Sequence, residues 1–279
     1  LLPIGAVDDF TKRNQPFKGT FDGRNHTLMN FYLTHTGGGM PQHLVGEDHY
    51  RKSTGLFAYL GANAVVKNLH LDTFLIEVIC ESSSFADHVY IGSIAGTCHS
   101  LDDNKDIIIS NCKVSNGSVV IKNNNNYSYF NVGGIVGLRS GYEKLTIENC
   151  EVNSFTVNDG GSKNSLEEIC IIAGIGPAWD AGYHGDGNDF KIYLNISNCV
   201  VKSIGKDKGL ELNWYINKLP WYWEFYQEFT EKEMPNLLLE EYSTSYYHIA
   251  DCINRHWTKI SNCYTPISYV NTTIQKFDY

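Results

Sequence analysis

The chain has 279 residues, enough for one large domain or two ordinary ones, and its 22 Lys and Arg stand against 31 Asp and Glu, a formal net charge of -9. No Lys- or Arg-rich block is present that would neutralise a row of phosphates, so we expect no nucleic-acid partner. No run of about 18 apolar residues is present either, so we expect no membrane-spanning segment.

The composition favours strands over helices. The 18 Tyr and 13 Phe with only 3 Met suit pleated surfaces. The first residues, Leu1-Leu2-Pro3-Ile4, lack an initiator Met and the basic-then-apolar layout of a signal peptide. We therefore expect an excerpt or a processed product of a longer parent chain.

The stretch "FKGTFDGRNHTL", residues 17–28, has the density of Gly, Asp, Asn and His that is typical of a ligand loop. Phe17, Gly19 and Phe21 alternate before Asp22-Gly23, and an apolar run follows at 27–33. This pattern predicts a strand, a tight turn with Gly at positive φ, and a second strand. We interpret the stretch as scaffold.

Two sequence blocks recur along the chain, and each Gly block precedes an Asn block. The Gly blocks are "TGLFAYLG" from Thr54, "GSIAG" from Gly92, "GGIVG" from Gly133 and "AGIG" from Ala173. The second block alternates apolar and polar residues up to an Asn, at Asn30, Asn68, Asn111, Asn149, Asn198 and Asn262. A unit of roughly forty residues built in this way is typical of a solenoid, whose neighbouring units bury a shared core.

The alternation inside the Asn blocks directs Ile107, Ile109 and Cys112 toward this shared interior. Stacked Asn side chains are expected to hydrogen-bond along the axis at one corner. We interpret the repeated Asn and Cys as structural. Ligand binding by the Asn positions is the alternative, and it is disfavoured because a residue found in every unit is explained by the unit.

The blocks "GTFDGRNHTL", "GLFAYLG", "VVKNLHL", "GGIVG" and "TIENCEV" resemble GLUG motif repeats, which occur in bacterial surface and secreted proteins, including regions that accompany IgA-protease-like enzymes. The resemblance covers about 17–201 and returns at 260–265. It implies a right-handed parallel β-helix and carries over no catalytic residues. The last Gly block has Pro177 where Gly would stand, so we expect an irregular coil there.

Eight cysteines raise the question of disulfides. Four of them share one slot of the repeat: Cys112, Cys150, Cys199 and Cys263. If each repeat is two coils, their Cα atoms lie about 10 Å apart, beyond the limit of about 7 Å for a disulfide. We therefore expect buried free thiols. No Cys-x-x-Cys pair is present, so we expect no zinc site.

The stretch "WDAGYHGDGNDF", residues 179–190, interrupts the repeat and brings Asp180, Asp186 and Asp189 close together in sequence. An oxygen-rich loop of this kind suits Ca²⁺, which takes about 6–8 oxygen ligands. It lacks the ligand spacing of an EF-hand loop. Calcium is thus the one candidate cofactor, and a plain solvated turn is the alternative.

The largest interruption spans residues 212–242. Trp221, Phe225 and Phe229 follow Pro220 at helical spacing, which predicts a helix with one aromatic stripe. One interpretation is a cover that hides apolar edges of the scaffold. The other is a glycan-binding platform, for which the candidate ligand-binding residues are Tyr222, Trp223 and Glu224.

Taken together, the sequence predicts an all-β fold: a right-handed parallel β-helix, or solenoid, with a partly helical, aromatic-rich insertion. We expect a single domain over 1–279, with repeats at about 17–204 and 249–270 and the insertion at about 205–248.

The leading functional hypothesis is a non-catalytic, adhesin-like module of an extracellular or cell-surface protein, presenting a face to a glycan or a host protein beside other domains of its parent chain. The alternative is a polysaccharide lyase or glycoside hydrolase on the same scaffold, for which no catalytic residue is assigned. A third hypothesis is a spacer between other domains.

Overall fold

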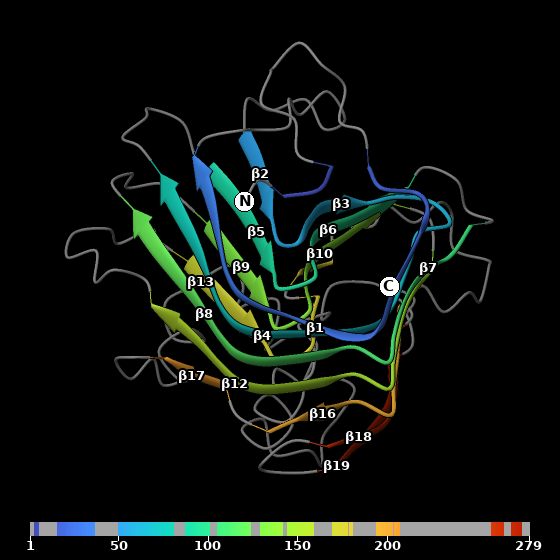
Figure 1. The fold of residues 1–279 in the computed structure, drawn as a ribbon. Helices are drawn as coiled ribbons and strands as arrows, with labels where there is room; N and C mark the ends of the chain where they lie inside the picture. Colours follow the sequence, from blue (N-terminus) through green and yellow to red (C-terminus); the bar gives the residue numbers. More distant parts are fainter. Residues whose placement is uncertain are drawn as a thin grey trace, which may run out of the picture.

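A computed structural model describes residues 3–5, 16–36, 50–80, 87–100, 105–123, 129–141, 144–158, 169–177, 179–180, 194–202, 204–206, 258–264 and 269–274. Within these ranges every regular element is a β-strand, and the strands form three sheets (Figure 1).

The long sheet has eleven strands: β1 (Thr20–Thr36), β4 (Val65–Cys80), β7 (Ile107–Ser110), β8 (Lys113–Asn123), β11 (Leu145–Glu148), β12 (Glu151–Asn158), β15 (Leu194–Ser197), β16 (Val200–Val201), β17 (Ile204–Lys206), β18 (Thr258–Tyr264) and β19 (Tyr269–Ile274). One four-stranded sheet contains β3 (Phe57–Leu60), β6 (Ala95–Ser100), β10 (Val136–Gly141) and β14 (Trp179–Asp180). The other contains β2 (Tyr50–Thr54), β5 (Asp87–Gly92), β9 (Tyr129–Gly133) and β13 (Ile169–Ala173).

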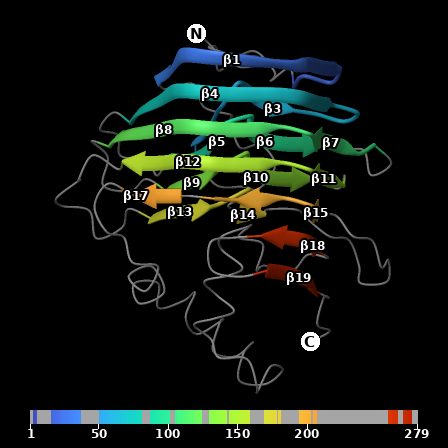
Figure 2. The same ribbon diagram turned by 60° about the horizontal axis from the view of Figure 1, so that its bottom comes forward.

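Successive strands go to different sheets, and the same order then returns one layer further along. For example, β5, β6 and β7–β8 form one layer, and β9, β10 and β11–β12 form the next (Figure 2). The strand pairs are parallel apart from β18 and β19, which are antiparallel. Leu71 lies opposite Val114, which in turn lies opposite Val152. One sequence unit therefore contributes one layer.

The structure corrects the fold class predicted from the sequence, a right-handed parallel β-helix, or solenoid, with a partly helical insertion. All regular elements of the described residues are strands, and their three sheets close round one apolar core. The repeating unit is one layer, and not the two coils that we expected. The predicted insertion at about 205–248 lies outside the described residues, except for the end of β17. We therefore describe the fold as a closed, three-sided parallel β structure.

The core follows from the period-two alternation of the strands. Ile107, Ile109 and Cys112 are buried, which confirms the direction predicted for them. In the long sheet, Phe31 and Phe74 stack with ring centroids 4.9 Å apart. Burial of each large aliphatic or aromatic side chain of this kind stabilises a fold by about 1.5–3 kcal/mol, so the inward positions account for most of the stability.

The glycine corners join the two four-stranded sheets and bring backbones of neighbouring layers into contact. A Cβ atom at Gly92 would overlap the carbonyl oxygen of Ala95 in the same turn and that of Ile135 in the next layer, and one at Gly133 would overlap that of Val136 in the same turn. The same corner continues through Ile175, whose carbonyl accepts a hydrogen bond from Ile135 N at 2.8 Å. The irregularity that we expected from Pro177 begins only after Ile175, at Gly176, whose φ is 107°.

The long sheet turns twice in each layer, and the residue at each turn has left-handed φ. At the first corner φ is 51–55° for Asn68, Asn111, Asn149, Asn198 and Asn262. At the second corner it is 50–57° for Asn30, Thr73, Asn116 and Ser154. Asn tolerates this conformation better than other residues with a side chain, which explains the repeated Asn.

The Asn ladder predicted from the sequence is confirmed in part. Asn111 Nδ2 donates to Asn68 Oδ1, and Asn262 Nδ2 donates to Asn198 Oδ1, both at 3.3 Å. Asn30 was assigned to the wrong corner, because Thr73 lies at its level in the next layer.

The hairpin predicted at residues 17–28 is also wrong. β1 is one strand parallel to β4, with a register shift between Asp22 and His26. Its first corner is formed by Arg24 and Asn25 at φ 50° and 60°, and not by a glycine at positive φ.

Candidate functional site

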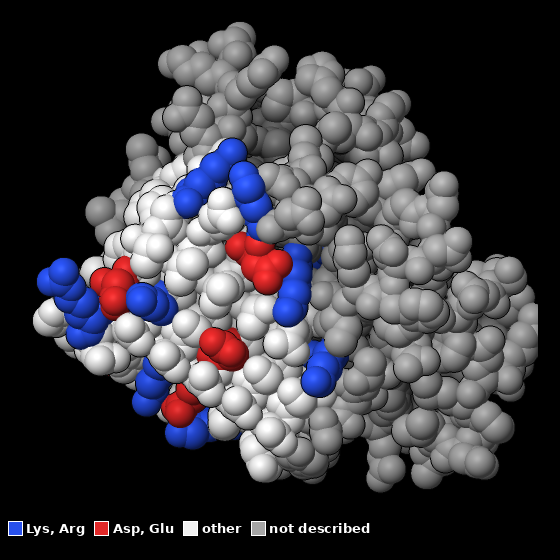
Figure 3. Space-filling view, turned by 90° about the vertical axis from the view of Figure 1, so that its right-hand side faces the viewer, with Lys and Arg blue, Asp and Glu red and all other residues white. Residues whose placement is uncertain are grey.

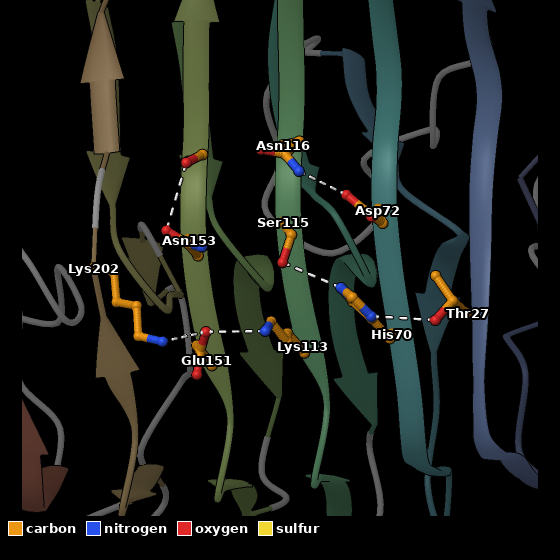
Figure 4. A network of polar contacts seen from close by, with 10 residues as sticks. Thr27, His70, Asp72, Lys113, Ser115, Asn116, Glu151, Asn153 and Lys202 are labelled. Carbon is orange, nitrogen blue, oxygen red and sulfur yellow. Dashed lines mark hydrogen bonds and ion pairs between the residues drawn. The ribbon is translucent and has the colours of Figure 1, made fainter.

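Polar side chains of the described residues recur regularly from layer to layer on the long sheet, between its two corners. Each layer has four residues there, such as 69–72, and alternate side chains point inward and outward. The polar outward residues form what we call the polar face: Thr27, His70, Asp72, Lys113, Ser115, Glu151, Asn153 and Lys202 (Figure 4). Two apolar residues, Met29 and Val200, lie at outward positions among them, and Ser115 is only 5% exposed.

His70 links three layers of the polar face. Its Nδ1 lies 3.2 Å from Thr27 Oγ1 on β1, and its Nε2 lies 3.1 Å from Ser115 Oγ on β8 (Figure 4). Either hydroxyl accepts from a ring N–H or donates to a ring nitrogen, so the imidazole is satisfied in each tautomer. The ring is therefore fixed across the strands.

Glu151 lies between two lysines of neighbouring layers. Lys202 Nζ is 2.8 Å and Lys113 Nζ is 3.4 Å from Glu151 Oε1. Partial burial raises the pKa of Glu151, but the two lysines outweigh this effect and the pKa is lowered overall. Glu151 is therefore ionised at neutral pH.

Asp72 is held at the other border of the polar face. Asn116 Nδ2 donates to Asp72 Oδ1 at 2.9 Å, and this bond lowers the pKa of Asp72, with smaller contributions from Thr73 and His70. Because an ionised carboxylate only accepts hydrogen bonds, Asp72 presents an acceptor to any bound group.

Two further carboxylates flank the polar face, one beyond each corner. A backbone hydrogen bond from Arg24, followed by one from the Asn68 amide, lowers the pKa of Asp22. Glu77 contacts Lys122 and the Tyr32 hydroxyl, and both contacts lower its pKa. Acidic and basic side chains are likewise interspersed on the described part of the side of the molecule shown in Figure 3. The described outer surface thus offers paired charges of both signs.

The inner side of the same part of the long sheet carries the four cysteines that share one slot of the repeat: Cys112, Cys150, Cys199 and Cys263. Each thiol is free and buried, as predicted. The predicted spacing is wrong, because these cysteines lie in adjacent layers, about 4.8 Å apart, in place of alternate coils. The neighbouring Cys150 side chain lowers the pKa of Cys112, whereas burial raises the pKa of Cys150.

The sequence-predicted site residues fall mainly outside the described part of the chain. Tyr222, Trp223 and Glu224 lie there, as do Asp186 and Asp189. Asp180 belongs to strand β14, where its backbone pairs with Arg139 of β10, and its side chain is not described. The glycan platform and the calcium loop therefore stay predictions.

Sequence reasoning missed the polar face. Its signal is the pair of polar positions after each corner Asn, as in "NLHLD", "NCKVS" and "NCEVN". These residues look like ordinary strand surface until the register places His70 between positions 27 and 115.

Among the described residues, no three His, Cys, Asp or Glu side chains converge as a metal site would require. The same residues include no helix of the length and apolarity needed to cross a membrane. No protein-family model, curated protein or solved structure matches the chain. The class of protein is therefore defined by the closed β structure and its polar face alone.

Proposed function

We propose that the protein is a non-catalytic binding module that presents the polar face to an extended glycan, as part of an extracellular or cell-surface protein. The resemblance to GLUG repeats, which occur in surface and secreted proteins, belongs to this proposal. The observation that carries it is the regular array of donors and acceptors across neighbouring layers, centred on Thr27, His70 and Ser115.

The array suits sugar hydroxyls for a geometric reason. Outward side chains recur at the strand spacing of about 4.8 Å, and three successive layers each add a polar pair: His70 and Asp72, Lys113 and Ser115, and Glu151 and Asn153. A sugar hydroxyl both donates and accepts hydrogen bonds, so it uses carboxylates, ammonium groups and hydroxyls equally. The balanced charges favour an uncharged chain over a polyanion.

The ionisation of the face supports binding over hydrolysis. Glycoside hydrolysis needs one carboxylic acid whose pKa is raised, so that it holds a proton at neutral pH. The described carboxylates with a shifted pKa, namely Asp22, Asp72, Glu77 and Glu151, all shift downward. They suit acceptor roles.

A binding experiment with one matched pair of variants tests the proposal. Calorimetric titration with a panel of neutral and acidic soluble polysaccharides is expected to give binding that Lys113→Ala weakens about fivefold or more, the effect of about 1 kcal/mol at an interface. Lys259→Ala is the control, because Lys259 is an exposed lysine on β18, outside the polar face. Its affinity is expected to match that of the unchanged protein.

Three results would contradict the proposal. Equal weakening by both substitutions would place the site elsewhere. New reducing or unsaturated ends in the same mixtures would support the polysaccharide-cleaving alternative. Binding to a host-cell protein that Lys113→Ala abolishes, with no glycan response, would make the partner a protein.

A further inference from the structure

The part of the long sheet that carries the polar face on its outer side carries a line of sulfur atoms on its inner side. Cys112, Cys150, Cys199 and Cys263 are at most 2% exposed. Their following residues pair in register, Lys113 with Glu151, Glu151 with Val200, and Val200 with Tyr264. We call these four cysteines the thiol stack.

Packing alone does not require cysteine at these positions. Leu69 occupies the same slot in the preceding layer, because its neighbour His70 pairs with Lys113. Leu69 is also buried. An aliphatic side chain therefore fits the slot, and the sulfur atoms add a chemical property that filling the core does not need.

The thiols are held in one orientation. Each Sγ donates to the carbonyl two residues earlier, at 3.2 Å for Cys112 and Cys150, 3.3 Å for Cys199 and 3.4 Å for Cys263. Because all four use the same local contact, the sulfur atoms are spaced as the strands are, at about 4.7–4.9 Å. Neighbouring sulfurs are thus arranged in pairs along a line.

This geometry selects a soft ion with two ligands. A linear bridge of two metal–sulfur bonds of about 2.3 Å each spans roughly the strand spacing. Zinc needs four ligands in a tetrahedron, and no such group converges among the described residues. Thiolates are preferred ligands of Cu(I), which accepts two-coordinate geometry.

Charge also favours a monovalent ion in this core. When one Cu⁺ replaces one thiol proton between two cysteines, the product contains a thiolate, a neutral thiol and the ion, and carries no net charge. The proton leaves to solvent, and no electron is transferred. An apolar core accepts such a neutral group far more readily than a charged one.

We propose that the thiol stack is a copper(I) site that holds one ion between Cys112 and Cys150 and a second between Cys199 and Cys263. This site does not depend on the proposed glycan binding, since it lies on the inner side of the long sheet and the polar face lies on the outer side. Because the stack is sealed, loading proceeds through local opening of the layers and is slow.

The test is an anaerobic titration of the reduced, full-length chain with Cu(I), supplied as its acetonitrile complex, against a chromophoric Cu(I) chelator. Two equivalents are expected to be withheld from the chelator after long incubation, with release of one proton for each ion. X-ray absorption of the loaded protein is expected to show two sulfur ligands for each copper. Copper bound through nitrogen or oxygen, or less than one equivalent retained, would overturn the proposal.

Matched variants assign the copper to the stack. The double variant Cys112→Ala/Cys150→Ala is expected to retain one equivalent fewer than the unchanged protein. Cys98→Ala is the control, because Cys98 is buried but lies on β6 in another sheet. Thermal melting confirms that each variant folds, and Cys263→Ala replaces the double variant if that one does not. Unchanged stoichiometry in the stack variants would overturn the proposal.

Discussion

In each layer the chain turns at a glycine corner between the two four-stranded sheets and at two corners along the long sheet, most of which carry Asn. The two kinds of corner need their residues for different physical reasons. At Gly133 the neighbouring backbone leaves no room for any side chain. At Asn149 the side chain is exposed, and what the position requires is a φ of 54°. A repeated residue can therefore mark either a lack of space or a strained backbone, and substitutions separate the two.

The largest effect is expected at the glycine corner. Gly133→Ala places a Cβ atom on the carbonyl of Val136 in the same turn, and Val136 cannot move aside without disturbing its backbone hydrogen bond to Ile175 O of the next layer. We expect a loss of about 3 kcal/mol or more in the free energy of unfolding, measured by urea denaturation. Gly19→Ala is the control, because the nearest atom there belongs to the Phe17 ring, at 3.3 Å. A loss at Gly19 equal to that at Gly133 would contradict the close-approach argument.

A smaller loss is expected at the asparagine corner. Asn149→Ala forces a residue with a Cβ and no compensating amide into left-handed φ, at a cost of about 1–2 kcal/mol. Asn149→Gly removes that steric cost and is expected to change stability little. If the glycine variant were as unstable as the alanine variant, the amide contacts and not φ would explain the repeated Asn.

An increase in the free energy of unfolding is expected at Thr73, where the second corner carries a residue other than Asn. Thr73 is β-branched and has φ 50°, an unfavourable combination. Thr73→Asn should raise the free energy of unfolding by roughly 0.5–1 kcal/mol. Thr156→Asn, within β12, serves as the comparison and is expected to give no gain. A destabilised Thr73→Asn would show that the Thr73 hydroxyl, 3.2 Å from Asp72 Oδ1, matters more than φ.

The smallest effect is a pH dependence of stability at the second asparagine corner. Asn116 lowers the pKa of Asp72 below its ordinary value of 3.8, so the unfolded chain takes up the proton first as the pH falls. The stabilising contribution of the Asp72 carboxylate to the folded state is therefore complete above about pH 5, and it is lost as the pH falls through the folded-state pKa. Melting temperatures of the unchanged protein and of Asp72→Asn should converge below about pH 4. A constant difference down to pH 2 would contradict the assignment.

The sequence identifies the repeats and the inward positions because both depend on local periodicity. Ile107, Ile109 and Cys112 could be placed from alternation alone. The number of layers in each repeating unit could not be predicted from the sequence. One long strand with two corners and two separate strands have the same apolar pattern. That ambiguity produced the wrong spacing of the cysteines.

The misplaced Asn30 and the overlooked polar face share a cause, which is register. Asn30 ends a run that resembles the Asn blocks, but the first corner of β1 is formed by Arg24 and Asn25, so Asn30 lies level with Thr73 and not with Asn68. The contacts of His70 likewise join positions 43 and 45 residues away. Neither relation leaves a local signal.

The pairing of Leu71 with Val114, and of Val114 with Val152, also has a consequence for how fast the protein folds. Each sheet contact between layers closes a loop of dozens of residues, and the entropy of that closure is lost before any ladder forms. Chains dominated by such distant contacts fold in milliseconds to seconds or more slowly. The first two layers to meet are therefore the kinetic bottleneck, and each later layer adds to a strand edge that is already in place.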